Sequence, residues 1–188
     1  VTLQANDIFR QHGYLGGTDE RRVQEFMAGW KDPKIKAIFP GTGGYGTTRI
    51  LDQLDYDIIK NNPKILIGFS DITGLHLAIN KMTDMVTFHT PSPMYGLGSK
   101  GNLPPISDQY FWQAIENENP NGYIIDPSKF KLSESMITFH GGKGKGELIG
   151  GNLSLINTLM GTPYEIDTDG KILFMEDVGE APYRLDRY

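Results

Sequence analysis

The first hundred residues alternate between helical and strand-like patterns, and this alternation constrains the fold more than any other feature of the sequence. Apolar residues recur at helical spacing within 19–31, 49–60 and 71–80, and short apolar runs typical of strands occupy 34–39, 65–69 and 85–88. Such alternation predicts an α/β fold in which helices cover a parallel sheet. Ligands of parallel sheets bind at the carboxyl ends of the strands, so the loops that follow these runs are candidate sites.

The second half of the chain has a different pattern of apolar residues and turns. A helical pattern at 107–117 is followed by a polar linker and then by strand-like runs between glycine-rich turns, with one helix at 152–160. The expected strands lie at 123–125, 136–139, 147–149 and 172–175. We therefore predict an N-terminal domain at 1–117, incomplete at its start, and a linker with a partial, β-rich C-terminal domain at 118–188.

Composition excludes several classes of protein. The 188 residues carry a net charge of -5 and no block of basic residues, so we expect no nucleic-acid partner. The absence of cysteine excludes disulfides, thiolate metal sites and a cysteine nucleophile. No apolar run reaches the roughly 20 residues of a membrane span, and no signal peptide opens the chain. The chain begins at Val1 without Met, and we expect it to be an internal piece of a longer protein.

A glycine-rich loop follows the first strand-like run. Gly41, Gly43, Gly44 and Gly46 lie within six residues, which lets another group approach the backbone amides closely. A phosphate cradle is one interpretation, but the Lys-Ser/Thr that follows the loop of a P-loop is absent. An oxyanion hole built from backbone N–H groups is the second. A loop that merely connects two elements is the third, and the residues alone do not separate these interpretations.

Ser70 lies where an apolar strand-like run meets a helical pattern. Serine is common at the start of a helix, where it caps free backbone N–H groups, so a capping role is the default. Gly68-Phe69-Ser70 also resembles the start of a nucleophile elbow, a tight strand-to-helix turn that exposes a serine hydroxyl. Ile72 stands where the full G-x-S-x-G motif has its second glycine. The local pattern favours the cap and leaves the nucleophile as the alternative.

A serine nucleophile needs a base, usually a histidine oriented by a carboxylate. His12, His76, His89 and His140 are the candidates, and His89 is the best placed because it follows the third strand-like run. A structural role is nevertheless the favoured interpretation for all four.

Three acids follow the last strand-like run, at Glu176, Asp177 and Glu180. A solvated turn is the simplest interpretation of this cluster. A carboxylate at a strand end could instead orient the histidine of a triad. A metal site is poorly supported, because no histidine or cysteine is near in sequence.

Three separated blocks, in order, resemble the LD-carboxypeptidases, the serine peptidases that include muramoyl-tetrapeptide carboxypeptidase and the microcin C self-immunity proteins. The blocks are residues 32–91, the segments GGNLSL and GTPY at 150–155 and 161–164, and the stretch 176–187. Together they cover most of the chain. The resemblance implies a flavodoxin-like domain joined to a β-rich domain, with the active site between them.

The resemblance also implies the roles of individual residues in catalysis. Ser70 matches the nucleophile, and Glu176 matches the carboxylate that orients the catalytic histidine. The backbone N–H of Asp71, with that of Gly43 or Gly44, would form the oxyanion hole. The family's catalytic histidine lies well downstream of the glutamate, so we expect it to lie outside this chain, as does the family's first strand.

The activity implied is hydrolysis of the L,D-amide bond that releases a terminal D-amino acid from peptidoglycan-derived tetrapeptides. Tyr45, His89 and Asn152 would bind this muropeptide substrate, with no cofactor and no metal. A homodimer in the cytoplasm is the implied state. The sequence departs from the family at Thr42, where arginine is frequent, and at Thr90, where glycine is usual in His-Gly-Pro.

Three alternatives remain open. One is a microcin C-type self-immunity hydrolase that cleaves a peptidyl-nucleotide amide. Another is a catalytically inactive relative that binds muropeptides. The third, from the pattern alone, is a flavodoxin-like nucleotide binder, against which the lack of a phosphate-binding lysine counts.

Overall fold

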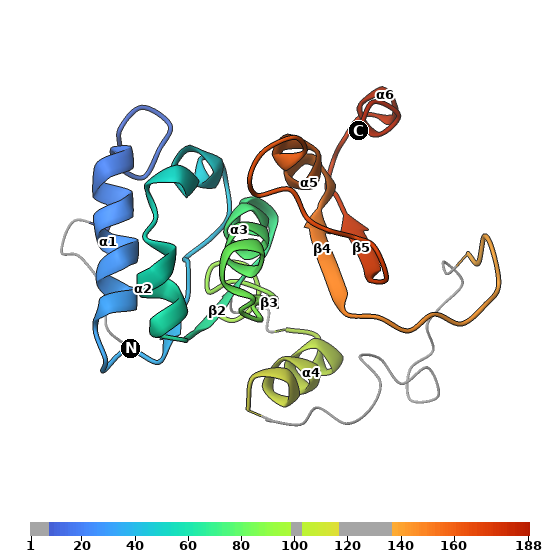
Figure 1. Ribbon diagram of the computed structural model, residues 1–188, viewed down its shortest axis with the longest axis horizontal. Helices are drawn as coiled ribbons and strands as arrows, with labels where there is room; N and C mark the ends of the chain where they lie inside the picture. The colour runs from blue at the N-terminus through green and yellow to red at the C-terminus, as the bar shows by residue number, and fades with distance from the viewer. Residues whose placement is uncertain (1–7, 99–102, 117–136) are drawn as a thin grey trace.

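The structure, a computed structural model, describes residues 8–98, 103–116 and 137–188. It contains helices and strands in mixed order (Figure 1). They are α1 (Asp19–Lys31), β1 (Ala37–Ile38), α2 (Tyr56–Asn61), β2 (Ile65–Gly68), α3 (Thr73–Thr83), β3 (Phe88–His89), α4 (Pro105–Glu116), β4 (Leu148–Asn152), α5 (Leu153–Leu159), β5 (Ile172–Glu176) and α6 (Pro182–Leu185). None of the helices within these described ranges is long and apolar enough to cross a membrane.

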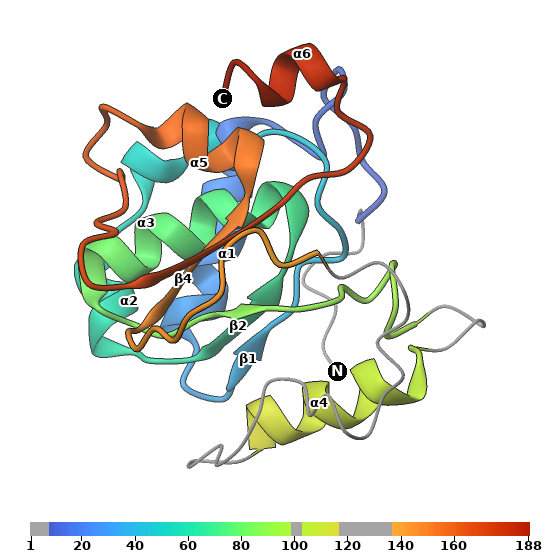
Figure 2. The same ribbon diagram turned by 90° about the vertical axis from the view of Figure 1, so that its right-hand side faces the viewer.

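The strands pair in parallel, which confirms the predicted α/β class. Strands β1, β2 and β3 form one sheet in that order, and β4 pairs with β5 in a second. Figure 2 shows β1 and β2 side by side beneath α3. Because neighbouring strands run the same way, the loops after β1, β2 and β3 emerge at one edge of the sheet. Gly68 is the register partner of His89, so the Ser70 turn and the end of β3 meet there.

Helix α3 is the centre of the packing. It lies between α2 on one side and β4 with α5 on the other (Figure 1). Every residue from Thr73 to Ile79 is buried, so this helix is enclosed around its first two turns. Ile149 and Leu159 join the same hydrophobic core as Trp30 and Ile59. The described parts of the two predicted domains therefore share one core around α3.

Some predicted elements are wrong. The continuous helix expected at 49–60 is replaced by two 3₁₀ turns, Thr47–Arg49 and Leu51–Gln53, before α2. The reason is Asp55, whose carboxylate accepts a 2.9 Å hydrogen bond from Ile58 N and starts α2 there. Residues 137–139 form no strand, and the strand expected at 123–125 lies outside the described residues. The strands expected at 147–149 and 172–175 and the helix at 152–160 are confirmed.

Gly150 is required where β4 meets β5. Its φ is 141°, and an added Cβ would overlap the carbonyl oxygen of its register partner, Phe174. We expect Gly150→Ala to lower the free energy of unfolding by about 2–3 kcal/mol, because the strands must separate to accept the methyl group. Urea denaturation measures this loss. Gly144→Ala is the matched control, because no atom of the residues that the structure describes lies within 4 Å of a Cβ added there. Equal stability of the two variants would contradict the observed pairing.

Candidate functional site

Ser70 lies on a strained turn directly after β2. Its φ is 60°, in the left-handed region that few residues other than glycine adopt. The chain passes through a 3₁₀ turn, Ser70–Ile72, into α3, whose N-cap position is Ile72 and carries no side-chain capping bond. Nothing within the described part of the chain hydrogen-bonds to the Ser70 hydroxyl. The favoured capping role is therefore wrong, and the positive φ at this strand-to-helix turn is compatible with the alternative, a nucleophile elbow.

Asp71 ties the glycine-rich loop to this turn. Its side chain is buried, and Oδ2 accepts a 2.9 Å hydrogen bond from Thr47 N. The Thr47 hydroxyl in turn donates to the Asp71 carbonyl at 2.6 Å. These two hydrogen bonds fix Thr47, at the end of the loop, against Asp71. The sequence analysis gave Thr47 no role, and only its position directly after the last glycine of the loop could have pointed to one.

Gly43 brings the glycine-rich loop against Ser70. A Cβ added to Gly43 would lie 2.8 Å from Ser70 Cβ, 3.1 Å from Ser70 Oγ and 3.3 Å from Asp71 N. No residue with a side chain fits this approach without movement. The backbone at Gly43 therefore lies beside the Ser70 side chain and the Asp71 amide. An oxyanion hole needs backbone N–H groups close to the reacting oxygen, and this approach is compatible with one.

Glu176 is the last residue of β5, where its register partner is Asn152. Asn152 caps α5 by accepting from Leu155 N, and its own backbone N donates to the buried Thr73 hydroxyl at 3.1 Å. Because Thr73 begins α3, this contact places the end of β4, the strand that pairs with β5, beside the Ser70 turn. Burial raises the pKa of the Glu176 carboxyl, against the effect of the Asn152 side chain, which lowers it.

His89 faces Glu176 from the end of β3. The distance from His89 Nε2 to Glu176 Oε1 is 3.8 Å, and the His89 ring packs edge-to-face on Phe174 with centroids 5.2 Å apart. Burial lowers the pKa of His89. Spacing in the sequence gave no hint of Phe174, which lies on the same strand as Glu176. His12 and His140 are exposed.

Two tyrosines lie at the outer side of the glycine-rich loop. The rings of Tyr14 and Tyr45 meet edge-to-face with centroids 5.7 Å apart, and the two residues are 77% and 63% exposed. Tyr45 was a predicted substrate-binding residue, and Tyr14 was missed. The pair forms an exposed aromatic surface on the loop that also contains Gly43.

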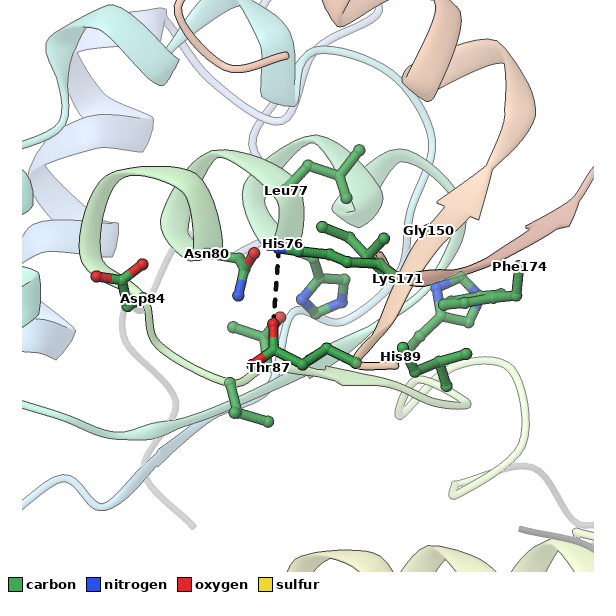
Figure 3. Close-up of a pocket in the computed structure, with 13 residues that line it drawn as sticks. His76, Leu77, Asn80, Asp84, Thr87, His89, Gly150, Lys171 and Phe174 are labelled. Carbon is green, nitrogen blue, oxygen red and sulfur yellow. Dashed lines mark ion pairs between the residues drawn. The ribbon is translucent and has the colours of Figure 1, made fainter. Parts of the chain in front are cut away.

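A cavity of about 410 Å³ lies between α3, β3, β4 and β5 (Figure 3). Figure 3 shows the His76 ring on the α3 side and the His89 ring beside Phe174. Lys171 Nζ lies 3.6 Å from Glu147 Oε2, the ion pair drawn as a dashed line. Across the described ranges, His, Asp and Glu side chains do not gather into a group that could hold a metal ion.

His76 has the structural role expected for it. Its Nε2 lies 3.0 Å from the Gly68 carbonyl oxygen, and burial lowers its pKa from 6.5 to about 4. Between these values the unfolded chain binds a proton that the folded protein does not, so stability is complete above pH 6.5 and falls as the pH falls towards 4. We expect a loss of about 2 kcal/mol between pH 8 and pH 5 from this residue.

Urea denaturation at the two pH values measures this loss. His76→Gln, which keeps a donor for Gly68, should lose about 2 kcal/mol less than the parent over the same interval. His12→Gln, at an exposed position, is the control and should behave as the parent does. Parallel pH profiles for His76→Gln and the parent would show that folding does not lower the pKa of His76.

Comparisons with known proteins agree with this geometry. Two family models match the chain, the LD-carboxypeptidase N-terminal domain at residues 1–90 and the LD-carboxypeptidase C-terminal domain at 145–188. The probable murein peptide carboxypeptidase of Bacillus subtilis is 42% identical over 177 residues, which are 94% of this chain and 53% of that protein.

Two solved structures share the fold. The muramoyltetrapeptide carboxypeptidase of Oxalobacter formigenes is 27% identical with a TM-score of 0.74, covering 96% of this chain and 58% of that one. MccF in complex with glutamyl sulfamoyl guanosine is 28% identical with a TM-score of 0.74, covering 95% and 59%. In Escherichia coli, MccF is a microcin C7 self-immunity protein; it is 31% identical over 193 residues, 93% of this chain and 56% of that protein.

The chain spans about half the length of the curated relatives it matches. The two family models fall on the two parts of the chain that contain Ser70 and Glu176. Sequence and fold lead to the same result: the chain belongs to the LD-carboxypeptidase family.

Proposed function

We propose that the protein containing this chain is a serine carboxypeptidase. It hydrolyses the L,D-amide bond that releases a terminal D-amino acid from peptidoglycan-derived tetrapeptides, as part of cell-wall recycling in the cytoplasm. The observation that carries the proposal is the strained turn at Ser70, with Gly43 pressed against the serine and the Asp71 amide beside it. Relatives named murein peptide carboxypeptidase and muramoyltetrapeptide carboxypeptidase support this substrate class.

The chemistry is acyl transfer through a covalent intermediate. Ser70 Oγ attacks the scissile carbonyl carbon while a histidine takes its proton. The backbone N–H groups of Asp71 and of Gly43 or Gly44 stabilise the negative charge on the carbonyl oxygen. The histidine returns the proton to the departing amine of the D-amino acid, and a water molecule then hydrolyses the acyl-serine.

Glu176 orients the imidazole of that histidine. No donor in the described ranges is within hydrogen-bond distance of Glu176 Oε1. An ionised carboxylate has about four acceptor positions, so Glu176 can accept an N–H from this imidazole and also one from a neighbouring side chain. We assign the base to a histidine that follows this chain in the family, since none of the four in the chain is held between Ser70 and Glu176 by a contact of the structure. The triad would then be Ser–Glu–His.

Substrate binding is assigned to groups around the turn. Tyr45, with Tyr14 beside it, offers an aromatic surface on the loop, and Asn152 is the register partner of Glu176. No cofactor or metal takes part in the proposed mechanism. A homodimer is the proposed assembly, and neither a nucleic acid nor a membrane is a proposed partner.

A specific observation favours one second candidate. The MccF structure contains glutamyl sulfamoyl guanosine, an amino acid joined to a nucleoside. The exposed Tyr14–Tyr45 pair is a surface on which a nucleobase could stack. A self-immunity hydrolase that cleaves a peptidyl-nucleotide amide would use the same serine and the same oxyanion hole. An inactive muropeptide-binding relative would retain the surface but lack the activity.

The test is a direct comparison of substrates with the intact protein. We expect release of D-alanine, detected by mass spectrometry, from a tetrapeptide whose last amide bond joins an L-configured residue to D-Ala. We expect no release of alanine from the isomer that ends in L-Ala. Faster cleavage of an aminoacyl sulfamoyl nucleoside would favour the self-immunity hydrolase. Binding of the tetrapeptide without cleavage of either compound would contradict both hydrolase proposals and would favour the inactive muropeptide-binding relative.

A further inference from the structure

Three buried polar atoms without a hydrogen-bond partner in the described part of the chain lie near one another. They are His76 Nδ1, His89 Nδ1 and Glu176 Oε1. The His76 and His89 ring centroids are 6.3 Å apart, and His89 Nε2 lies 3.8 Å from Glu176 Oε1. Buried polar atoms in folded proteins are normally paired, so this group calls for a functional explanation.

The Gly68 carbonyl fixes the proton on His76. This oxygen accepts from Thr90 N at 2.9 Å and lies 3.0 Å from His76 Nε2, so Nε2 must be the protonated nitrogen of that ring. His76 Nδ1 is then an acceptor. His89 presents Nε2 to a carboxylate, which accepts hydrogen bonds, and the tautomer with the proton on Nε2 is therefore favoured for His89.

Strand β2, which precedes Ser70, and strand β5, which ends at Glu176, both hold His89 in place. Gly68, two residues before Ser70, is the register partner of His89, and Phe174, two residues before Glu176, supports the ring edge-to-face at 76°. The side chain thus bridges the end of β2 and the end of β5. A shift of about 1 Å would bring His89 Nε2 from 3.8 Å to hydrogen-bond distance of Glu176 Oε1.

We propose that His89 is a positioning residue that donates from Nε2 to Glu176 and fixes the carboxylate relative to the Ser70 turn. The inference rests on the proposed function, in which Glu176 orients the catalytic histidine, and it replaces the predicted contact of His89 with substrate. The other charged groups that line the cavity are Asp84, and Lys171 paired with Glu147. Hydrogen bonds that orient the ligands of metal sites typically change activity 10–100-fold when removed, and we expect an effect of similar size from this contact.

A measurement that needs no activity tests the contact itself. Imidazole NMR of the protein follows the titration of His89, with assignment from His89→Gln. We expect Glu176→Gln to move the His89 midpoint to lower pH by about one unit, because a carboxylate favours the protonated ring and the amide does not. Glu20→Gln, at an exposed position on α1, should leave the midpoint unchanged. An unchanged midpoint in Glu176→Gln would overturn the proposal whether or not the protein is a peptidase.

Kinetics of the intact protein test the consequence. We expect His89→Phe to lower kcat by about 10–100-fold with KM nearly constant. His89→Gln, whose amide nitrogen reaches the position of Nε2, should recover most of the loss. A rise in KM at constant kcat would instead make His89 a substrate-binding residue. A loss as deep as that of Ser70→Ala would make it the base, and either result would overturn the positioning role.

Discussion

Ser70→Ala is expected to lower kcat of the intact protein by at least about 10⁴-fold on the peptide it cleaves. The hydroxyl supplies the bond that forms with the substrate, and in the described part of the chain nothing else is hydrogen-bonded to it. Steady-state release of the D-amino acid measures kcat. KM or Kd for the peptide should change little, because alanine keeps Cβ and the shape of the turn. Ser107→Ala, on α4, is the matched control and should keep full activity.

Ser70→Gly separates the chemistry from the strain. It removes the same hydroxyl, so it should be as inactive as the alanine variant. Glycine adopts a φ of 60° without strain, and we therefore expect Ser70→Gly to raise the free energy of unfolding by about 1 kcal/mol. Retention of more than a few per cent of the parent's activity by both variants would remove Ser70 from the mechanism, and with it the proposed function.

The alternation of patterns predicted the parallel sheet because each period reports which face of an element is buried. Helix α1 and strands β2, β4 and β5 were found near their expected positions for that reason. The helix expected at 49–60 failed because its apolar spacing is compatible with two short 3₁₀ turns. A single aspartate, Asp55, decided between them by capping α2. Such a competition between a side chain and the helix backbone is local, and periodicity does not report it.

Ser70 shows a different limit. A serine between a strand and a helix has the same pattern whether it caps the helix or carries a nucleophile, and the cap is the more frequent case. What distinguishes the two is a backbone angle and the approach of Gly43, a residue 27 positions earlier in the chain. The resemblance to the LD-carboxypeptidases was what favoured Ser70 as the nucleophile, because the local pattern of a single sequence does not display the geometry of such a turn.

The contact between His89 and Glu176 was beyond prediction from spacing. It joins β3 to β5 across a connection that includes residues outside the described ranges. Pairing of Asn152 with Glu176 and the bond from Asn152 N to Thr73 bring the two ends together. Each of these contacts depends on the register of strands far apart in the sequence. The sequence therefore allowed the candidate site residues to be named, but it did not allow a prediction of which of them contact one another.

Gly43→Ala is the second change with a large expected effect, and it acts on the oxyanion hole while leaving every catalytic side chain in place. The new methyl group would lie 2.8 Å from Ser70 Cβ and 3.3 Å from Asp71 N, so the loop must move away from the turn. Loss of one donor of an oxyanion hole typically costs about 10²–10³ in kcat. We expect a loss of that size, since displacement of the loop withdraws its N–H group from the developing negative charge.

Gly41→Ala is the matched control, in the same loop and of the same chemistry. An added Cβ at Gly41 has no atom of another residue within 4 Å among those the structure describes, so this variant should retain activity within about twofold. Both variants should also bind the tetrapeptide with similar Kd, because the ground-state peptide carries no full charge on its carbonyl oxygen. Equal kcat for Gly43→Ala and Gly41→Ala would mean that the loop supplies no donor to the oxyanion, and the hole would then consist of the Asp71 amide and groups outside the loop.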